Sequence, residues 1–358
     1  MRSAASRCSG SMLSTVLAVI FLISGALAQA PTTGTPATSP GANDQTPPGQ
    51  QQAAPGGNEV PQSPAAGQEP VSPEPGTNDQ GSMFVFKRQV EEVVLHATVV
   101  DEQRRLVTGL ERGTFTVLDA GVPQAITSFR REDVPVAMGI VIDNSGSMRE
   151  KREKINQAVL NLIRASNPQD QIFVVNFGQD PYLDQDFTSD VKLLQAALHQ
   201  VSAKGSTALY DAIVASAVHL ASSPLDKKVL LVITDGQDNM SQETLLEASH
   251  RLQQANGPTL YAVGLLGSGL EGPGREALQR LAERSGGVSY FPETLDQVDN
   301  ITRTVAHDIR SQYMIAYKPR NQNVKPGYQS VRVEAHAPGY NKLTVRTRTG
   351  YYPSAPSH

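Results

Sequence analysis

Cysteine is almost absent from this chain, and its scarcity excludes several kinds of chemistry. The 358 residues include one cysteine, Cys8, which precedes an apolar run from Met12 to Leu27. A chain that loses this leader keeps no disulfide, no thiol nucleophile and no cysteine-ligated metal. Because no cysteine follows the apolar run, we also predict no lipid-modified N-terminus.

Familiar catalytic patterns are missing as well. None of the seven histidines has the H-x-x-x-H or H-E-x-x-H spacing of a zinc site. The sequence contains no G-x-S-x-G nucleophile context and no phosphate-binding P-loop. We therefore interpret the histidines as ordinary core or surface residues and predict that the protein is not an enzyme.

An excess of one charge is lacking in the part of the chain that should fold. The formal net charge is −4, and five of the acidic residues lie in segment 29–81, which has no Lys or Arg. The rest of the chain is near neutral, with both signs scattered. This distribution provides no electrostatic case for binding nucleic acid or an anionic membrane.

The start of the chain has the features of an export signal. Arg2 and Arg7 precede the apolar run, and Ala26-Leu27-Ala28 is a small-x-small cleavage pattern. We predict a signal peptide over 1–28; an uncleaved anchor is the alternative, although the run is short for a membrane span. The mature protein would then have no membrane span. It would be a secreted or extracytoplasmic bacterial protein, in the periplasm or at the cell surface.

Residues 29–81 differ sharply in composition from the rest of the chain. They are rich in Pro, Gly, Gln, Ala, Ser and Thr and contain no aromatic residue. Such a segment cannot bury enough apolar surface to offset the entropy of ordering it. We predict a disordered tether that acts as a spacer, with a specific ligand segment as the less favoured interpretation.

The remaining residues divide into three segments. Residues 82–132 and 312–353 show the short alternating pattern of β-strands. Neither is long enough for a β-sandwich of its own, so we expect them to pair into one small β-sandwich-like module. The α/β domain over 133–311 would then be inserted between them.

Strands and helices alternate through 133–311. Continuous apolar runs, such as 134–142 and 228–234, are typical of strands buried on both faces. Helical periodicity follows each of them, and Ser241 is expected to cap the helix that ends near Leu252. This pattern predicts a doubly wound, mostly parallel α/β sheet, in which ligands bind at the carboxyl ends of the strands.

Oxygen-bearing side chains gather at those strand ends. Asp143 and Asp235 each end a predicted strand, Ser145 and Ser147 follow Asp143, and Thr207 begins a predicted helix. Hydroxyl and carboxylate oxygens suit Mg²⁺, with Mn²⁺ or Ca²⁺ as substitutes. Asp143 and Ser145 alone could be a helix cap, and Asp235-Gly236 alone a turn. The five together favour a metal site.

This arrangement resembles a known family. The pattern Asp143-Asn-Ser145-Gly-Ser147, then Thr207, then Asp235-Gly is similar to the metal-ion-dependent adhesion site (MIDAS) of von Willebrand factor type A (VWA) domains. The resemblance covers 133–311. The flanking stretches VTGLERGTFTVLDAGVPQAITSF and RTRTGYY resemble bacterial secreted proteins called VWFA-related, a family without a settled activity.

The resemblance implies a domain that binds a divalent cation and a protein ligand. In such domains the two serines and the threonine typically touch the metal, while the aspartates often act through water. An open coordination position would receive an Asp or Glu of the partner, as in cell adhesion. The alternative is an assembly module whose metal only stabilises loops and whose β surface makes the contacts. The partner's identity and the oligomeric state are left open.

A glycine motif suggests a different class of function. Residues 267–272 match G-x-G-x-x-G, which would indicate a dinucleotide-binding enzyme. A true fingerprint opens its helix within the glycines. Here Pro273 and Gly274 prolong the predicted loop, and the helix is expected near Arg275. We therefore interpret the motif as a flexible loop.

Overall fold

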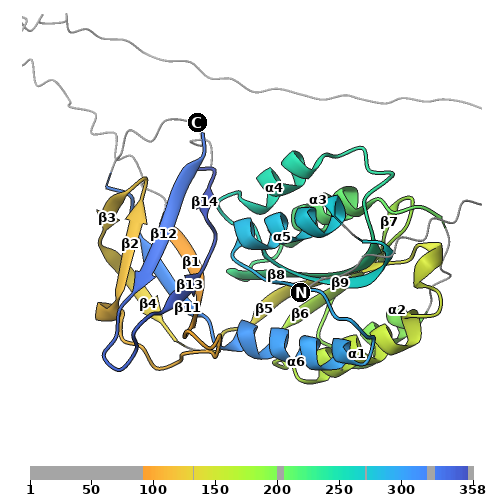
Figure 1. The fold of residues 1–358 in the computed structure, drawn as a ribbon, viewed down its shortest axis with the longest axis horizontal. Helices are drawn as coiled ribbons and strands as arrows, with labels where there is room; N and C mark the ends of the chain where they lie inside the picture. Colours follow the sequence, from red (N-terminus) through yellow and green to blue (C-terminus); the bar gives the residue numbers. More distant parts are fainter. Residues whose placement is uncertain (1–91, 132, 200–204, 271, 321–326, 354–358) are drawn as a thin grey trace, which may run out of the picture. The chain divides into compact units, whose positions relative to one another are not determined.

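The computed structural model describes residues 92–131, 133–199, 205–270, 272–320 and 327–353. The predicted signal peptide and tether lie outside the described residues. Within these ranges, an α/β domain built on one central sheet is accompanied by two smaller sheets (Figure 1). The predicted fold class, a doubly wound sheet with a β-sandwich-like module, is confirmed.

The central sheet has six strands in the order β10-β9-β8-β5-β6-β7. Its strands are β5 (Val136–Asp143), β6 (Gln171–Phe177), β7 (Pro181–Thr188), β8 (Lys227–Gly236), β9 (Thr259–Gly269) and β10 (Ser289–Tyr290). All neighbours pair in parallel except β7, which is antiparallel to β6. From β5 the chain goes to β6 on one side and later to β8 on the other. The ends of β5 and β8 therefore flank the switch in strand order where such sheets bind ligands.

Helices cover both faces of this sheet (Figure 1). One face carries α1 (Arg152–Arg164), α2 (Val191–His199) and α6 (Gln297–Arg310), and the other carries α3 (Leu209–Ala221), α4 (Leu245–Leu252) and α5 (Pro273–Ser285). Successive residues of a strand point to opposite faces. Accordingly, Met138 and Ile140 pack in the cluster of α1 and α6, and Val141 packs in that of α3.

Gly139 lets the central strands pack closely under α3. A Cβ atom at this position would lie 2.4 Å from Cζ of Phe173 and 2.7 Å from Cδ2 of Leu230. Both neighbours are fully buried, so neither can move aside without opening the core. The glycine is thus a packing requirement of the strand that ends at Asp143.

Two four-stranded sheets form the β-sandwich, in the orders β13-β1-β11-β4 and β14-β12-β2-β3. Their strands are β1 (Val93–Val100), β2 (Phe115–Asp119), β3 (Val122–Gln124), β4 (Ile126–Arg130), β11 (Tyr313–Tyr317), β12 (Gln329–Ala335), β13 (Thr344–Arg346) and β14 (Gly350–Tyr351). Strands from before and after the α/β domain pair directly, as β1 does with β11 and β2 with β12. Asp119, buried between the sheets, accepts hydrogen bonds from the hydroxyls of Tyr317 (2.9 Å) and Tyr351 (3.2 Å).

Some local predictions are wrong. Helix α4 is capped by Thr244 and not by Ser241. The Ser241 hydroxyl instead accepts the backbone N–H groups of Tyr210 and Asp211 in the first turn of α3. Strand β7 was not predicted, because its sequence PYLDQDFT is polar and half-exposed, as expected of an edge strand.

Among the residues that the structure describes, no helix combines the length and apolar character that crossing a bilayer requires.

Candidate metal centre

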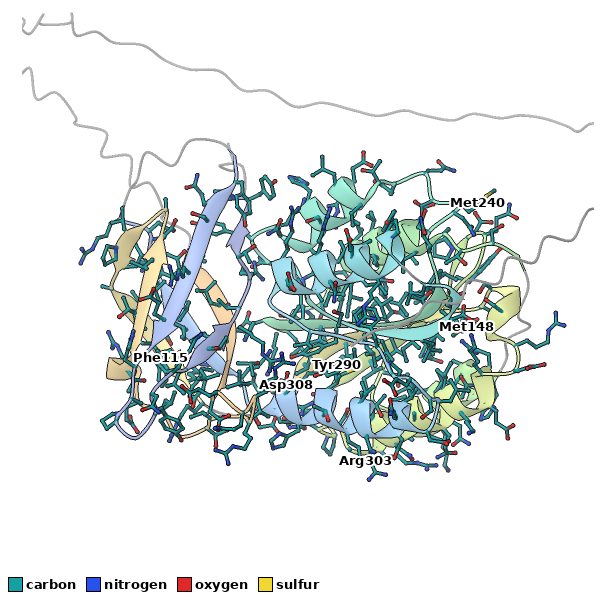
Figure 2. All side chains as sticks on the ribbon, viewed as in Figure 1. Phe115, Met148, Met240, Tyr290, Arg303 and Asp308 are labelled. Atoms are coloured by element: carbon teal, nitrogen blue, oxygen red, sulfur yellow. The ribbon has the colours of Figure 1, made fainter. Side chains whose placement is uncertain are left out.

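The carboxyl ends of β5 and β8 bring the predicted site residues to one edge of the sheet. Asp143 ends β5, and Asp235 is the penultimate residue of β8. A 3-10 turn, η2 (Gly146–Met148), lies in the connection between β5 and α1. In Figure 2 the labelled Met148, from that turn, and Met240, from the loop after β8, lie at this end of the domain, away from Asp308.

Asp143 is held through both of its carboxylate oxygens. Oδ1 accepts the backbone N–H of Ser145 at 2.7 Å, and Oδ2 accepts the hydroxyl of Thr234 at 2.6 Å. The side chain is completely buried. Burial raises the pKa of Asp143, the nearby charge of Asp235 raises it further, and the donated hydrogen bonds oppose the rise. Asp143 therefore organises the loop from inside the protein.

Ser145, Ser147 and Asp235 form a connected chain of oxygens. The two serine hydroxyls lie 3.1 Å apart, and the Ser147 hydroxyl donates to Oδ1 of Asp235 at 2.8 Å. Oδ2 of Asp235 accepts from the ammonium group of Lys151. Both oxygens of this buried carboxylate are thus engaged by groups from the loop that precedes α1.

Thr207 reaches the same edge from the segment before α3. Its backbone N–H donates to the side-chain oxygen of Asn239 at 2.9 Å, and its carbonyl accepts the N–H of Asn239 at 3.0 Å. A Cβ atom at Gly236 would lie 3.2 Å from the Thr207 hydroxyl oxygen and 3.8 Å from Oδ2 of Asp143. Gly236 therefore leaves a space between a hydroxyl and a carboxylate that any other residue would begin to fill.

These residues fit a hard divalent cation. The structure brings together all five predicted side chains, which offer three hydroxyls and two carboxylates from three separate segments. Oxygen donors of this kind suit Mg²⁺, Mn²⁺ or Ca²⁺ rather than a soft metal. The part of the chain that the structure describes holds no group of three or more His, Cys, Asp or Glu side chains placed to bind a metal. A site here must therefore depend on its hydroxyls.

The neighbouring acids support the loops around the site. Asp211 accepts the backbone N–H groups of Gln242 (3.1 Å) and Glu243 (2.8 Å), as expected of a residue that caps a loop. Asp238 accepts the N–H of Tyr210 at 3.1 Å. These bonds connect the loop after β8 to the first turn of α3. Thr207 lies shortly before that turn in the sequence.

Three contributors were missed by the sequence analysis: Thr234, Lys151 and Arg152. Arg152 is buried, and it donates to the carbonyl of Asp143 (3.3 Å) and the side-chain oxygen of Asn176 (2.9 Å). Burial lowers the pKa of Arg152 to about 10, against the attraction of Asp143. No local pattern marked Lys151 or Thr234, because these residues meet Asp235 and Asp143 across 84 and 91 residues of the chain.

The G-x-G-x-x-G motif has a different structure from the one predicted. Gly267 and Gly269 lie inside β9, so they do not form the expected loop. Pro273 and Gly274 are the first residues of α5 and not an extension of a loop. Because two of the glycines belong to a strand, they cannot wrap a phosphate at the helix N-terminus as a dinucleotide fingerprint does.

A family comparison agrees with this fold. Residues 138–237 match the family model described as the von Willebrand factor type A domain. The matched range contains all five predicted site residues. The resemblance inferred from the motif is confirmed, and the α/β domain is of the von Willebrand factor type A class.

Solved structures of modest similarity are also found. The von Willebrand factor type A protein from Catenulispora acidiphila is 15% identical over 75% of this chain and 76% of its own, with a TM-score of 0.44. The PilB minor pilin from Streptococcus sanguinis is 13% identical over 51% of this chain, with a TM-score of 0.42; the match covers 63% of the pilin. Proximal thread matrix protein 1 from the mussel byssus, in a structure described as having a zinc-occupied MIDAS motif, is 18% identical over 54% of this chain and 50% of its own (TM-score 0.45). No curated protein matches the chain.

Proposed function

We propose that this protein is an exported, non-enzymatic binding protein whose contact with a partner depends on a divalent cation. The cation, Mg²⁺ or in its place Mn²⁺ or Ca²⁺, would be held by Asp143, Ser145, Ser147, Thr207 and Asp235. The observation that carries the proposal is the convergence of these five oxygen-bearing side chains at the switch point of the sheet. When bound, such a cation supplies an open coordination position for an Asp or Glu carboxylate of the partner protein.

The chain's own hydrogen bonds prepare the site for that role. The two carboxylate oxygens of Asp143 accept hydrogen bonds from Ser145 and Thr234, so Asp143 fixes the loop that presents the two serine hydroxyls. Asn239 fixes the backbone of Thr207 in the same way. The two carboxylates do little more than cancel a divalent charge. Where they act through water, the groups in direct contact with the cation are neutral hydroxyls, and the cation keeps its attraction for an incoming anion.

A binding role is favoured over catalysis by the partners of these side chains. In the described part of the chain, they are hydroxyls, backbone groups, Asn239 and the ammonium of Lys151. None of these is an imidazole placed to act as a general base beside a nucleophile. The predicted signal peptide and tether would export the domain and extend its reach from the periplasmic or cell-surface side.

Titration calorimetry with MgCl₂ tests the cation. We expect the wild type to bind Mg²⁺ and Asp143→Ala to bind it at least about 10-fold more weakly, because the loop that carries Ser145 loses its anchor. Asp296→Ala, which removes a highly exposed carboxylate, is the matched control and should bind like the wild type. Failure of the wild type to bind Mg²⁺, or undiminished binding by Asp143→Ala, would refute the metal site.

The partner interaction needs a separate measurement. Proteins captured from the source's envelope fraction should bind in MgCl₂ and be released by EDTA, and blocking of acidic side chains on the captured protein should abolish rebinding. The assembly-module alternative makes the opposite prediction. There, EDTA lowers the melting temperature but leaves capture intact.

A further inference from the structure

Lys151 places a positive charge on the carboxylate that the proposed cation would need. Its ammonium group forms an ion pair with Oδ2 of Asp235, while Oδ1 of Asp235 accepts from Ser147. The Asp235 side chain is 1% exposed and that of Lys151 is 24% exposed. The lysine therefore reaches from the rim of the site onto a carboxylate that solvent barely contacts.

This ion pair offsets part of the cost of placing two carboxylates in the buried interior of the site. Asp143 and Asp235 are both buried at this edge of the sheet. A buried carboxylate without a counter-charge is costly, by several kcal/mol in typical proteins. A divalent cation would provide that counter-charge, and in its absence the Lys151 ammonium provides it.

The adjacent cation, Arg152, cannot play the same part. Its guanidinium is fixed by the carbonyl of Asp143 and the side chain of Asn176, below the loop. Lys151 lies just before α1, where a flexible four-carbon stem borders solvent, so its ammonium can move away from Asp235 when another cation takes its place. Of these two consecutive basic residues, Arg152 fixes the loop and Lys151 can exchange its place at Asp235 with another cation.

We propose that Lys151 is a tethered cation that competes with the divalent ion for Asp235. It lowers the affinity of the site for metal and keeps the metal-free site folded. The competition follows from charge, because an ammonium group and a divalent cation at one carboxylate oxygen repel each other. This inference rests on the proposed metal site. It means that Lys151, a residue of the chain itself, helps to set the cation concentration at which that site fills.

The test is calorimetric titration of full-length Lys151→Met with MgCl₂. Methionine keeps a similar stem and removes the charge, so we expect Mg²⁺ to bind at least about 10-fold more tightly than to the wild type. Lys154→Met is the matched control, since Lys154 is one turn along α1 and pairs with the exposed Asp296; its affinity should stay within about twofold of the wild type. Lys151→Arg, which keeps the charge, should show no gain.

Thermal unfolding supplies a readout that does not depend on a bound metal. In EDTA, Lys151→Met should melt below the wild type, and saturating MgCl₂ should remove the difference; Lys154→Met should show neither effect. If Lys151→Met does not fold, Lys151→Gln removes the charge while retaining a donor for Asp235, and tighter Mg²⁺ binding is again expected.

The outcomes separate this inference from the proposed function. Binding of Mg²⁺ to Lys151→Met or Lys151→Gln that is equal to or weaker than wild-type binding overturns the competition and leaves the metal site intact. Absence of Mg²⁺ binding in the wild type and in these variants overturns the metal site itself.

Discussion

At the scale of single residues, the site depends on groups that fix the candidate ligands as much as on the ligands. Thr234 is fully buried, and its hydroxyl donates to Asp143 while accepting the N–H of Gly236 at 3.1 Å. A buried carboxylate that lost this donor would carry an unsatisfied charge, which costs more than the bond itself contributes. Thr234 therefore determines where Asp143, and with it the serine loop, is held.

Gly236 permits a direct prediction at this scale. Gly236→Ala places a methyl group 3.2 Å from the Thr207 hydroxyl oxygen, so that hydroxyl must shift by a few tenths of an ångström. We expect Mg²⁺ affinity to fall by about 10-fold, as measured by calorimetry, with little change in the melting temperature in EDTA.

The control for this substitution lies in the same site. A Cβ atom at Gly146 would meet no atom within 4 Å, so Gly146→Ala should bind Mg²⁺ like the wild type. Equal affinities of Gly236→Ala and Gly146→Ala would mean that the Thr207 hydroxyl does not contribute to binding.

At the scale of elements, helix starts organise the loops around the site. Helix α4 begins with a capping box, in which the Thr244 hydroxyl accepts the N–H of Glu247 (3.2 Å) and the Glu247 carboxylate accepts the N–H of Thr244 (2.7 Å). With this end satisfied locally, Ser241 is available to the first turn of α3. One loop thus serves two helices, and one of them follows Thr207.

Removal of the cap should cost stability but not metal binding. Thr244→Ala leaves the N–H of Glu247 without its acceptor, and we expect the free energy of unfolding to fall by about 1 kcal/mol. Urea denaturation measures this change. Thr304→Ala, at an exposed position inside α6, is the control and should stay within about 0.5 kcal/mol of the wild type. Similar values for the two variants would argue against the capping box as a stabilising element.

At the scale of the whole described chain, a buried arginine and a partly buried one join the β-sandwich to the α/β domain. The Arg348 guanidinium donates to the carbonyls of Gln254 (3.0 Å), Ala255 (2.8 Å) and Gly257 (2.7 Å) beyond α4. Arg346 pairs with Asp308 of α6 at 2.9 Å. The bonds of Arg348 satisfy carbonyls that follow a helix end. Arg348 lies between β13 and β14, more than 90 residues from those carbonyls in the sequence.

His96 of β1 makes this junction sensitive to acid. Burial, together with the charges of Lys227 and Arg348, lowers the pKa of His96 to about 3 from its ordinary value of 6.5. The unfolded chain therefore binds this proton more readily than the folded one, and stability should be lost as the pH falls from 6.5 towards 3. Urea denaturation at pH 7 and pH 4.5 should show a smaller loss for His96→Gln than for the wild type.

An exposed histidine of the same sandwich provides the comparison. His336 is exposed in the structure, and His336→Gln should lose as much stability on acidification as the wild type does. If His96→Gln and the wild type lose the same amount, the half-buried imidazole of His96 is not a source of the acid sensitivity.

Much of the fold could be predicted because buried segments have apolar residues at recognisable positions in the sequence. Runs such as 134–142 are apolar at every position, as a strand covered on both faces requires, and the predicted fold class is confirmed. Strand β7 was missed because an edge strand is partly exposed and needs no continuous run of apolar residues. The capping position was wrong although Thr244-Leu-Leu-Glu247 carries the S/T-x-x-E signal of a capping box, because Ser241, the first hydroxyl-bearing residue after β8, was preferred.

The sequence by itself was sufficient for the candidate ligands, for a reason of topology. Asp143, Ser145, Ser147, Thr207 and Asp235 follow predicted strand ends or begin a helix, and a parallel sheet collects such positions at one edge. Their assignment as metal ligands stays a prediction. The positions of their supports depend on contacts between distant segments, as Thr234 meets Asp143 across 91 residues and Lys151 meets Asp235 across 84. Neither contact has a local pattern, because a side chain's partner is set by which strands and turns become neighbours once the chain has folded.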